Sequence, residues 1–219
     1  MGFFDKKYCD ICGEKIGLLG NRKLQDGNMC KDCAKKLSPW FTERRETDIA
    51  GIKEQLAYRE QNKQAVADFN TTVQLGEEMR IYVDEQARKF MITDAHNLEK
   101  ENPDVFDLDS VTNCSLRIHD SQRELQTKNS RGEMVSYDPP RFEYSVWFHI
   151  TLNMNHPYVD EISFQLNEYV LKIKQSGGTF LGLSLFDPRE DYECRRYIAM
   201  AEEICQALTG RPLTNITRS

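Results

Sequence analysis

The sequence predicts an α+β protein built from a small four-cysteine module, a linking helix and an antiparallel β-rich domain closed by a C-terminal helix. Three observations carry this prediction. Two C-x-x-C pairs lie within the first 33 of 219 residues. Later segments alternate apolar and polar residues, as half-buried strands do, and the apolar period then changes to a helical one. We place the module at 1–45, the linking helix at 46–74 and the β-rich domain at 75–219.

The paired cysteines predict a metal site. Cys9 and Cys12 form one pair and Cys30 and Cys33 the other, with seventeen residues between the pairs. This spacing is typical of structural zinc, whereas a redox dithiol would be expected beside a βαβ pattern that the sequence lacks. Four thiolates close a tetrahedron around Zn²⁺ at about 2.3 Å and leave no position open for catalysis. We therefore expect one structural Zn²⁺, with iron in a four-thiolate site as the alternative.

The residues around the cysteines indicate how the module folds. Gly13 can take a positive φ after the first pair, and Asp26-Gly27 predicts a hairpin turn between the pairs. The second pair should lie in the first turn of a helix that stops near Ser38-Pro39, since proline disfavours helix in the residue before it. The order of knuckle, hairpin and helix is typical of a treble-clef or zinc-ribbon module.

Charge separates this module from the rest of the chain. Residues 1–45 hold ten lysines and arginines against six acidic residues, a net +4, while the remainder carries −10. A basic head on an acidic body is one pattern of nucleic-acid binding proteins. The structural interpretation is that the basic residues balance the −2 charge of a zinc tetrathiolate. These residues are Lys15, Arg22, Lys23, Lys31, Lys35 and Lys36.

Residues 47–70 predict the linking helix, with Thr47 as its N-cap. Apolar residues recur at helical spacing near both ends, while residues 59–63 are polar on every side. A helix of this kind often bridges two packed bodies, so we expect its first half on the module and its second half on the body. A linker that melts in solution is the alternative. The apolar positions are Ile49, Ile52, Leu56, Val66 and Phe69.

Period-two alternation predicts the strands of the body. We expect a hairpin over 79–93 with its turn at 84–87, a third strand around 114–118, a long strand over 142–154 and an antiparallel partner around 162–166. A further strand over 179–186 should follow a turn at Gly177-Gly178. Residues 126–141 are polar and hold one glycine and two prolines, and so predict a loop.

The last helix should begin with Asp187 as N-cap, Pro188 at the first position and Glu190 three residues after the cap. Gly210 and Pro212 should end it. Its apolar stripe should lie on the sheet, so that Cys194 and Cys205 are buried small hydrophobes, as is Cys114 on its strand.

The sequence carries no pattern of a known catalytic centre, and we expect no enzyme. It lacks the nucleophile, zinc-protease and phosphate-loop motifs, and no nucleophile accompanies the histidines, which are His96, His119, His149 and His156. No apolar run approaches the length of a membrane span, and the first residues resemble neither a signal peptide nor a myristoylation site. We therefore expect a cytoplasmic protein with reduced cysteines.

Two resemblances add to this interpretation. One is carried by the run YCDICGEKIGLLGNRKLQDGNMCKDCAKKLSPWF, followed by RR and IKEQLAYRE. This run resembles the N-terminal domain of the uncharacterised bacterial DUF 4428 family. The resemblance implies a bacterial, Gram-positive source and a metal-binding module with Cys9, Cys12, Cys30 and Cys33 as ligands, and it brings no activity. The order of strands followed by an amphipathic helix looks like a bacterial pleckstrin-homology-like (PH-like) domain, an analogy of fold alone.

The function we expect is that of a non-catalytic zinc-binding adaptor or regulator with a protein partner of unknown identity. Nucleic-acid binding by the basic module is one alternative. Peripheral membrane binding by the PH-like body is another, although a body charge of −10 opposes anionic lipid surfaces.

Overall fold

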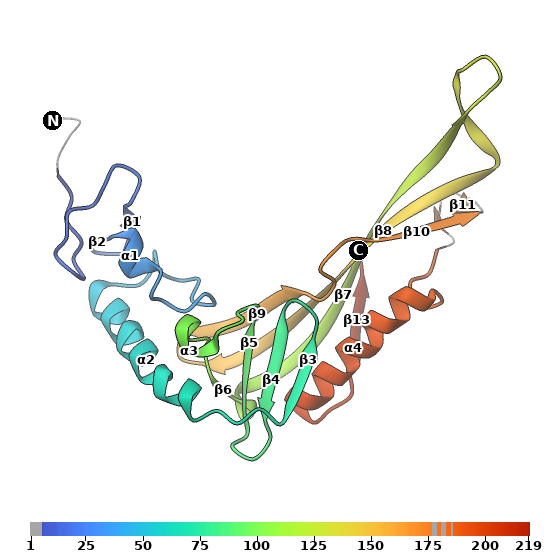
Figure 1. The fold of residues 1–219 in the computed structure, drawn as a ribbon. Helices are drawn as coiled ribbons and strands as arrows, with labels where there is room; N and C mark the ends of the chain where they lie inside the picture. The colour runs from blue at the N-terminus through green and yellow to red at the C-terminus, as the bar shows by residue number, and fades with distance from the viewer. Residues whose placement is uncertain (1–5, 177–178, 181–182, 185) are drawn as a thin grey trace.

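The computed structural model describes residues 6–176, 179–180, 183–184 and 186–219. The chain forms a crescent (Figure 1). The cysteine module and helix α2 (Ile49–Ala67) make one limb, two sheets and helix α4 (Tyr192–Thr209) make the centre, and a long β-hairpin projects as the other limb. No helix in the described part of the chain is long and apolar enough to cross a membrane.

The module has little regular structure. Strands β1 (Arg22–Lys23) and β2 (Asn28–Met29) pair antiparallel around the predicted Asp26-Gly27 turn, and α1 (Lys31–Ala34) follows. The helix ends four residues before Ser38, earlier than predicted. A handful of side chains form the small core: Cys9, Ile16, Leu24, Met29, Cys33, Leu37 and Ile52.

Helix α2 (Ile49–Ala67) begins one residue later than predicted. Asp48, not Thr47, is its N-cap, because Asp48 Oδ1 accepts from the Gly51 amide at 2.8 Å. The Thr47 hydroxyl instead donates to the carbonyl of Glu43 at 2.8 Å. The helix is continuous, with its first half against the module core and its last turn against the body, as predicted.

A four-stranded antiparallel sheet follows α2, in the order β3-β4-β5-β6. The predicted hairpin is confirmed as β4 (Arg80–Asp84) and β5 (Lys89–Thr93). Strands β3 (Val73–Gly76) and β6 (Phe106–Asp107) were not predicted, since each is too short to show alternation. Short helices α3 (Leu98–Glu101) and η1 (Leu108–Ser110) lie on either side of β6 in the chain.

The second sheet is larger and contains the strongest sequence signal. Its path is β10-β8-β7-β13, with β9 also paired to β8. Its strands are β7 (Val111–Lys128), β8 (Met134–His156), β9 (Val159–Gln165), β10 (Leu171–Ser176) and β13 (Asn215–Arg218). The antiparallel pairing of β8 with β9 was predicted. Strand β10 was missed, as was β13, which pairs parallel to β7.

The segment predicted as one strand over 179–186 contains two short paired strands, β11 (Thr179–Phe180) and β12 (Leu183–Ser184). The predicted Gly177-Gly178 turn lies outside the described residues.

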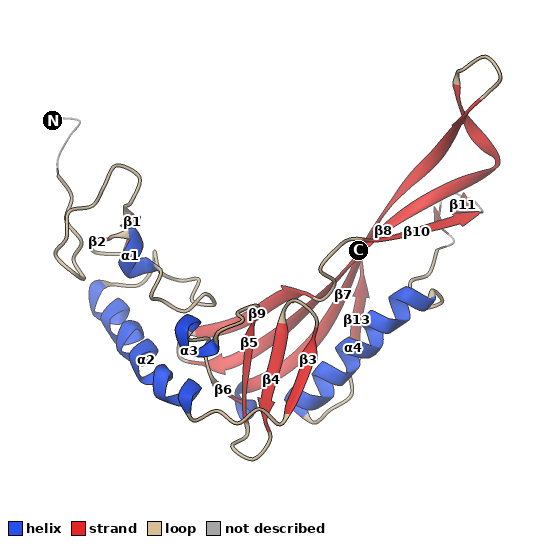
Figure 2. Cartoon of the chain, viewed as in Figure 1, coloured by secondary structure: helices blue, strands red, loops and turns tan. Residues whose placement is uncertain are grey.

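Residues 126–141 are not a loop. Most of them extend β7 and β8 into the projecting hairpin, which we call the arm (Figure 2), and only residues 129–133 connect the two strands. The register shifts between Leu125 and Gln126, which pair with Arg141 and Ser136. Residues 137–140 therefore bulge out of the ladder. The bulge accommodates Pro139 and Pro140, whose missing amide donors made a strand improbable from sequence.

Helix α4 (Tyr192–Thr209) starts later than predicted. Asp191 is the N-cap and accepts from the Cys194 amide at 3.0 Å, whereas Asp187 accepts from the Arg189 amide in the preceding turn. Gly210 ends the helix in the left-handed conformation, as predicted. The apolar stripe of α4 packs on both sheets, and Cys114, Cys194 and Cys205 are buried there.

The main core lies between the two sheets and α4. Its centre is the inward face of β8, where every second residue from Tyr144 to Leu152 is buried. The sheets stay separate over the described residues, so the body is an α+β assembly of two main sheets and the small β11-β12 pair, and not a closed barrel. The predicted C-terminal helix is present as α4, and the unpredicted strand β13 follows it.

Candidate metal centre

The four paired cysteines converge on one point although two chain segments supply them. Their sulfur atoms all lie within 4.8 Å of one another, and the Cys12 and Cys30 sulfurs are 3.8 Å apart. Tetrahedral ligands about 2.3 Å from one ion lie about 3.8 Å apart, so the spacing fits a four-thiolate ion. None of the four forms a disulfide. The sulfurs could therefore hold a metal ion.

Backbone geometry explains the convergence. The Gly13 amide donates to the Cys9 carbonyl at 2.8 Å, which closes the first turn, and Gly13 takes a φ of 77° as predicted. The Cys30 amide donates to the Cys9 sulfur at 3.2 Å. Cys30 is also the N-cap of α1, because its sulfur accepts from the Cys33 amide at 3.3 Å. The first turn and the start of α1 are thus joined through the sulfurs themselves.

Amide donors favour the charged form of one of these thiols, Cys9. Burial acts to raise the pKa of Cys9, but hydrogen bonds from the backbone of Cys12, Cys30 and Ile11 outweigh it and lower the pKa to about 6. The pKa of Cys33 is raised by burial and by the neighbouring cysteines. Cys9 is therefore favoured as a thiolate. Crowding of the thiols disfavours the charged form of Cys33, and a bound cation would remove that penalty.

The lysines near the sulfurs do not touch them. Among the described residues, the sulfurs of the cluster accept hydrogen bonds from backbone amides and from no lysine. Lys35, Lys36, Lys63 and Lys100 instead border a cleft of about 600 Å³ beside Cys12, between the module, α2 and α3. They are placed to compensate the charge of a metal tetrathiolate at longer range.

A buried polar network fixes the metal module to the body, and sequence reasoning missed it. Asp104, just before β6, has a fully buried carboxylate. It accepts from Arg59 Nη1 at 2.7 Å and from the Ser38 hydroxyl at 2.7 Å. Ser38 belongs to the module, Arg59 to α2 and Asp104 to the body, so one carboxylate joins all three parts.

Asn62 extends this network by one turn of α2. Its amide nitrogen donates to the Pro103 carbonyl at 2.7 Å, and its oxygen accepts from the Val105 amide at 2.9 Å. Arg59 and Asn62 belong to the stretch 59–63 that looked polar on every side, yet both are buried. The signal in the sequence was their spacing of three residues, which continues the stripe of Ile52 and Gln55 along one helical face.

The remaining candidate residues lie apart from the cysteines. His156 packs against Tyr58, Phe106 and Tyr158, where α2 meets the body. Burial is the main cause that lowers its pKa. His119 and His149 lie on the large sheet, and His96 is exposed after β5. Burial raises the pKa of Cys114, and it raises that of Cys194 to about 12, which keeps both thiols neutral.

Comparison with known proteins gives one match, which covers the N-terminal cysteine module. Residues 7–55 match the family described as Domain of unknown function (DUF4428). This span holds the four cysteines and the first turns of α2 and leaves the two sheets outside the match. No curated protein and no solved structure matches the chain, and nothing among these comparisons supports a PH-like body.

Proposed function

We propose that this chain is a non-catalytic zinc protein in which a structural metal module is held rigidly on a β-rich binding body, as an adaptor or regulator. The observation that carries this proposal is the arrangement of four sulfurs within 4.8 Å of one another, next to a buried network that ties the same module to the body. A saturated tetrathiolate has no vacant position for a substrate. The module then serves to hold a surface in place.

Zinc is the ion that we propose for the site. Both zinc and iron accept four thiolates, but zinc has no redox chemistry and is the usual metal of C-x-x-C pairs at this spacing. The order of turn, hairpin and short helix supports a treble-clef or zinc-ribbon type of module. Elemental analysis of protein purified without chelator should give one zinc per chain. A metal content near zero, or a visible iron–thiolate absorption band, would contradict the proposal.

The binding role of the body is proposed from its shape and from its joint with the module. Figure 1 shows a crescent in which the arm and the module project from opposite ends of the core. The order of strands before an amphipathic helix supports a PH-like interaction domain at the level of element order alone. Capture from cells that naturally contain this chain should recover a protein partner with the metal-loaded form. Recovery of the same partner with Cys33→Ser would show that the module is dispensable.

A further inference from the structure

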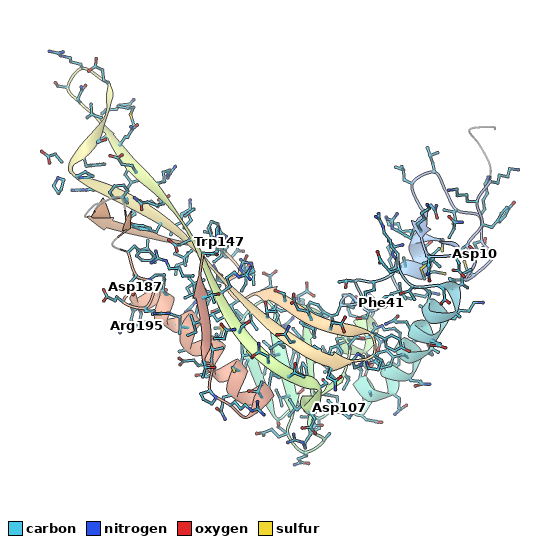
Figure 3. The ribbon with its side chains drawn as sticks, turned by 180° about the vertical axis from the view of Figure 1, so that it is seen from behind. Asp10, Phe41, Asp107, Trp147, Asp187 and Arg195 are labelled. Carbon is cyan, nitrogen blue, oxygen red and sulfur yellow. The ribbon has the colours of Figure 1, made fainter. Side chains whose placement is uncertain are left out.

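The large sheet has one buried face and one open face. Residues of β7, β8, β9, β10 and β13 that alternate with the core positions project to the side opposite α4 and the small sheet. Among these residues, those whose side chains the structure describes are exposed or half-buried, with Glu143 as the exception. Figure 3 shows the molecule from behind and labels Trp147 on β8, where the arm leaves the body.

Aromatic rings lie at the middle of this open face. Trp147 pairs across the ladder with His119, and their ring centroids are 5.3 Å apart with an interplanar angle of 33°. The next pair on the same face is His149 with Arg117. His119 also contacts the main chain of Ser219 at 3.1 Å. Two ladder rungs thus place an indole, two imidazoles and a guanidinium side by side.

Cations continue from these rings toward the arm. Arg123 and Lys174 flank Glu143 on the neighbouring strands, Lys172 pairs with Ser145, and Arg141 pairs with Leu125. We call these five cations and the indole the basic face: Arg117, Arg123, Arg141, Lys172, Lys174 and Trp147. Arg123 lies six positions after Arg117 on β7, so the basic face extends over about 20 Å.

The charge of the basic face is neutralised only in part. The chain carries −6, yet in the described ladder of the large sheet the acidic residues paired on this side are Glu143 and, at the far end of β9, Glu161. Glu143 accepts from Arg123 at 2.8 Å and lies 4.0 Å from Lys172. No carboxylate of the described structure lies within ion-pair distance of Arg117, Arg141 or Lys174.

The pKa of His149 is affected by the same positive potential. Its pKa is lowered first by burial and then by the charges of His119 and Arg117. An anion bound here would gain attraction that no group of the described chain supplies.

From this face we infer a binding site for single-stranded nucleic acid. Proteins that bind single strands combine cations that follow the backbone with aromatic side chains on which bases stack. The basic face provides both, because the indole lies among cations from three strands. An acidic peptide would use the cations but gain nothing from base stacking, and a duplex keeps its bases from the ring. This site is separate from the metal module and goes beyond the adaptor proposal.

Fluorescence anisotropy with a labelled oligo(dT) of about twelve nucleotides tests the inference on the full metal-loaded chain. Binding should weaken with salt, with a slope of log K against log[salt] of roughly −2 to −3, if three or four phosphates are contacted. Trp147→Ala should weaken binding about 5- to 100-fold, as loss of one stacking contact does. Arg117→Gln or Lys174→Gln should reduce the slope by about 0.7 each.

Matched controls come from the outer side of α4, far from the basic face. Tyr192→Ala removes an exposed aromatic ring and Arg195→Gln removes an exposed cation, and both variants should bind like the parent chain. Trp147→Phe keeps a stacking surface and should recover most of the affinity, with thermal unfolding confirming that each variant is folded.

Several outcomes would overturn the inference. One is absence of binding at low salt in the parent chain. Another is equal affinity for polyglutamate or for a duplex of the same charge, which would make the face a general surface for acidic partners. The third is unchanged binding by folded Trp147→Ala, or equal weakening by Arg195→Gln.

Discussion

The metal module and the β-rich body hold their shapes by different means. The module has two strands of two residues and a helix of four, around a core of seven buried side chains. The body packs two sheets and an eighteen-residue helix around a far larger core. A fold with so few apolar contacts cannot offset the entropy of ordering its chain. We therefore expect one region to depend on a single centre, whereas the other distributes its stability over many contacts.

Metal removal should produce the largest difference between the two regions. Cys33→Ser removes one proposed ligand, and structural zinc contributes on the order of 10 kcal/mol of folding free energy in small modules. We expect residues 7–45 to lose protection from hydrogen exchange while the two sheets keep theirs. Cys114→Ala is the matched control, because it removes a buried cysteine from the body and should leave the metal content at one per chain.

The next largest effect should come from the joint between the two regions, by which we mean the buried network of Ser38, Arg59, Asn62 and Asp104. Asp104→Ala leaves Arg59 buried without its partner, and breaking a buried pair costs about 3–5 kcal/mol. Urea unfolding should show this loss, and hydrogen exchange should place it in α2 and at the start of β6. The double variant Arg59→Met with Asp104→Leu should regain most of the stability, since it leaves no unpaired charge.

Asp107→Ala controls for the loss of a carboxylate on the surface. Asp107 forms an ion pair with Lys89 and its side chain is 70% exposed, so this change should cost less than about 1 kcal/mol. Equal destabilisation by Asp104→Ala and Asp107→Ala would mean that the joint is not a buried electrostatic contact.

The sequence revealed features that are local or strictly periodic. The C-x-x-C spacing indicated the four sulfurs, and alternation along β8 predicted its buried face correctly from Tyr144 to Met154. The arm was missed because its strands are exposed on both sides, so no apolar alternation marks them, and because Pro139 and Pro140 fall in a bulge. Strand β13 was missed because its four residues pair with β7 from a distance in the chain that no local pattern records.

The basic face and the joint could not be predicted from the sequence for a related reason. Interleaving of aromatic and basic residues is absent along the chain, but it arises across strands, where Trp147 lies between residues of β7 and β10. The joint was hidden because Arg59 and Asp104 are ordinary polar residues whose burial is created by packing. Both misses concern contacts between segments far apart in sequence, whereas the metal site needed only one turn and one helix start.

A smaller effect should come from the first turn of α4, because the body spreads its stability over many contacts. Asp191→Ala removes the observed N-cap and should cost about 1 kcal/mol. Asp187→Ala removes the residue that sequence reasoning placed at the cap, and should cost a few tenths of a kcal/mol, since its carboxylate serves a turn outside the helix. Thermal unfolding of the two variants ranks them. A larger loss for Asp187→Ala would contradict the observed start of the helix.

The smallest effect should be a pH dependence at the joint. Burial lowers the pKa of His156 below its ordinary 6.5, against the opposing charges of Asp104 and Asp107. Because the folded state favours the neutral ring, the stabilisation is complete above pH 6.5 and is lost as the pH falls through the folded pKa. Between pH 7.5 and 5.5 the parent chain should lose more stability than His156→Gln.

His96 is exposed and lies outside the joint, so His96→Gln controls for the loss of a histidine side chain as such. His149 has a lowered pKa as well, so His149→Gln separates a contribution of the open sheet face from that of the joint. If hydrogen exchange at pH 5.5 increases first in α2, the contact between module and body is the part that responds to protonation. If it increases first in β7 and β8, the large sheet responds to protonation instead, and the joint is more stable at low pH than the sheet.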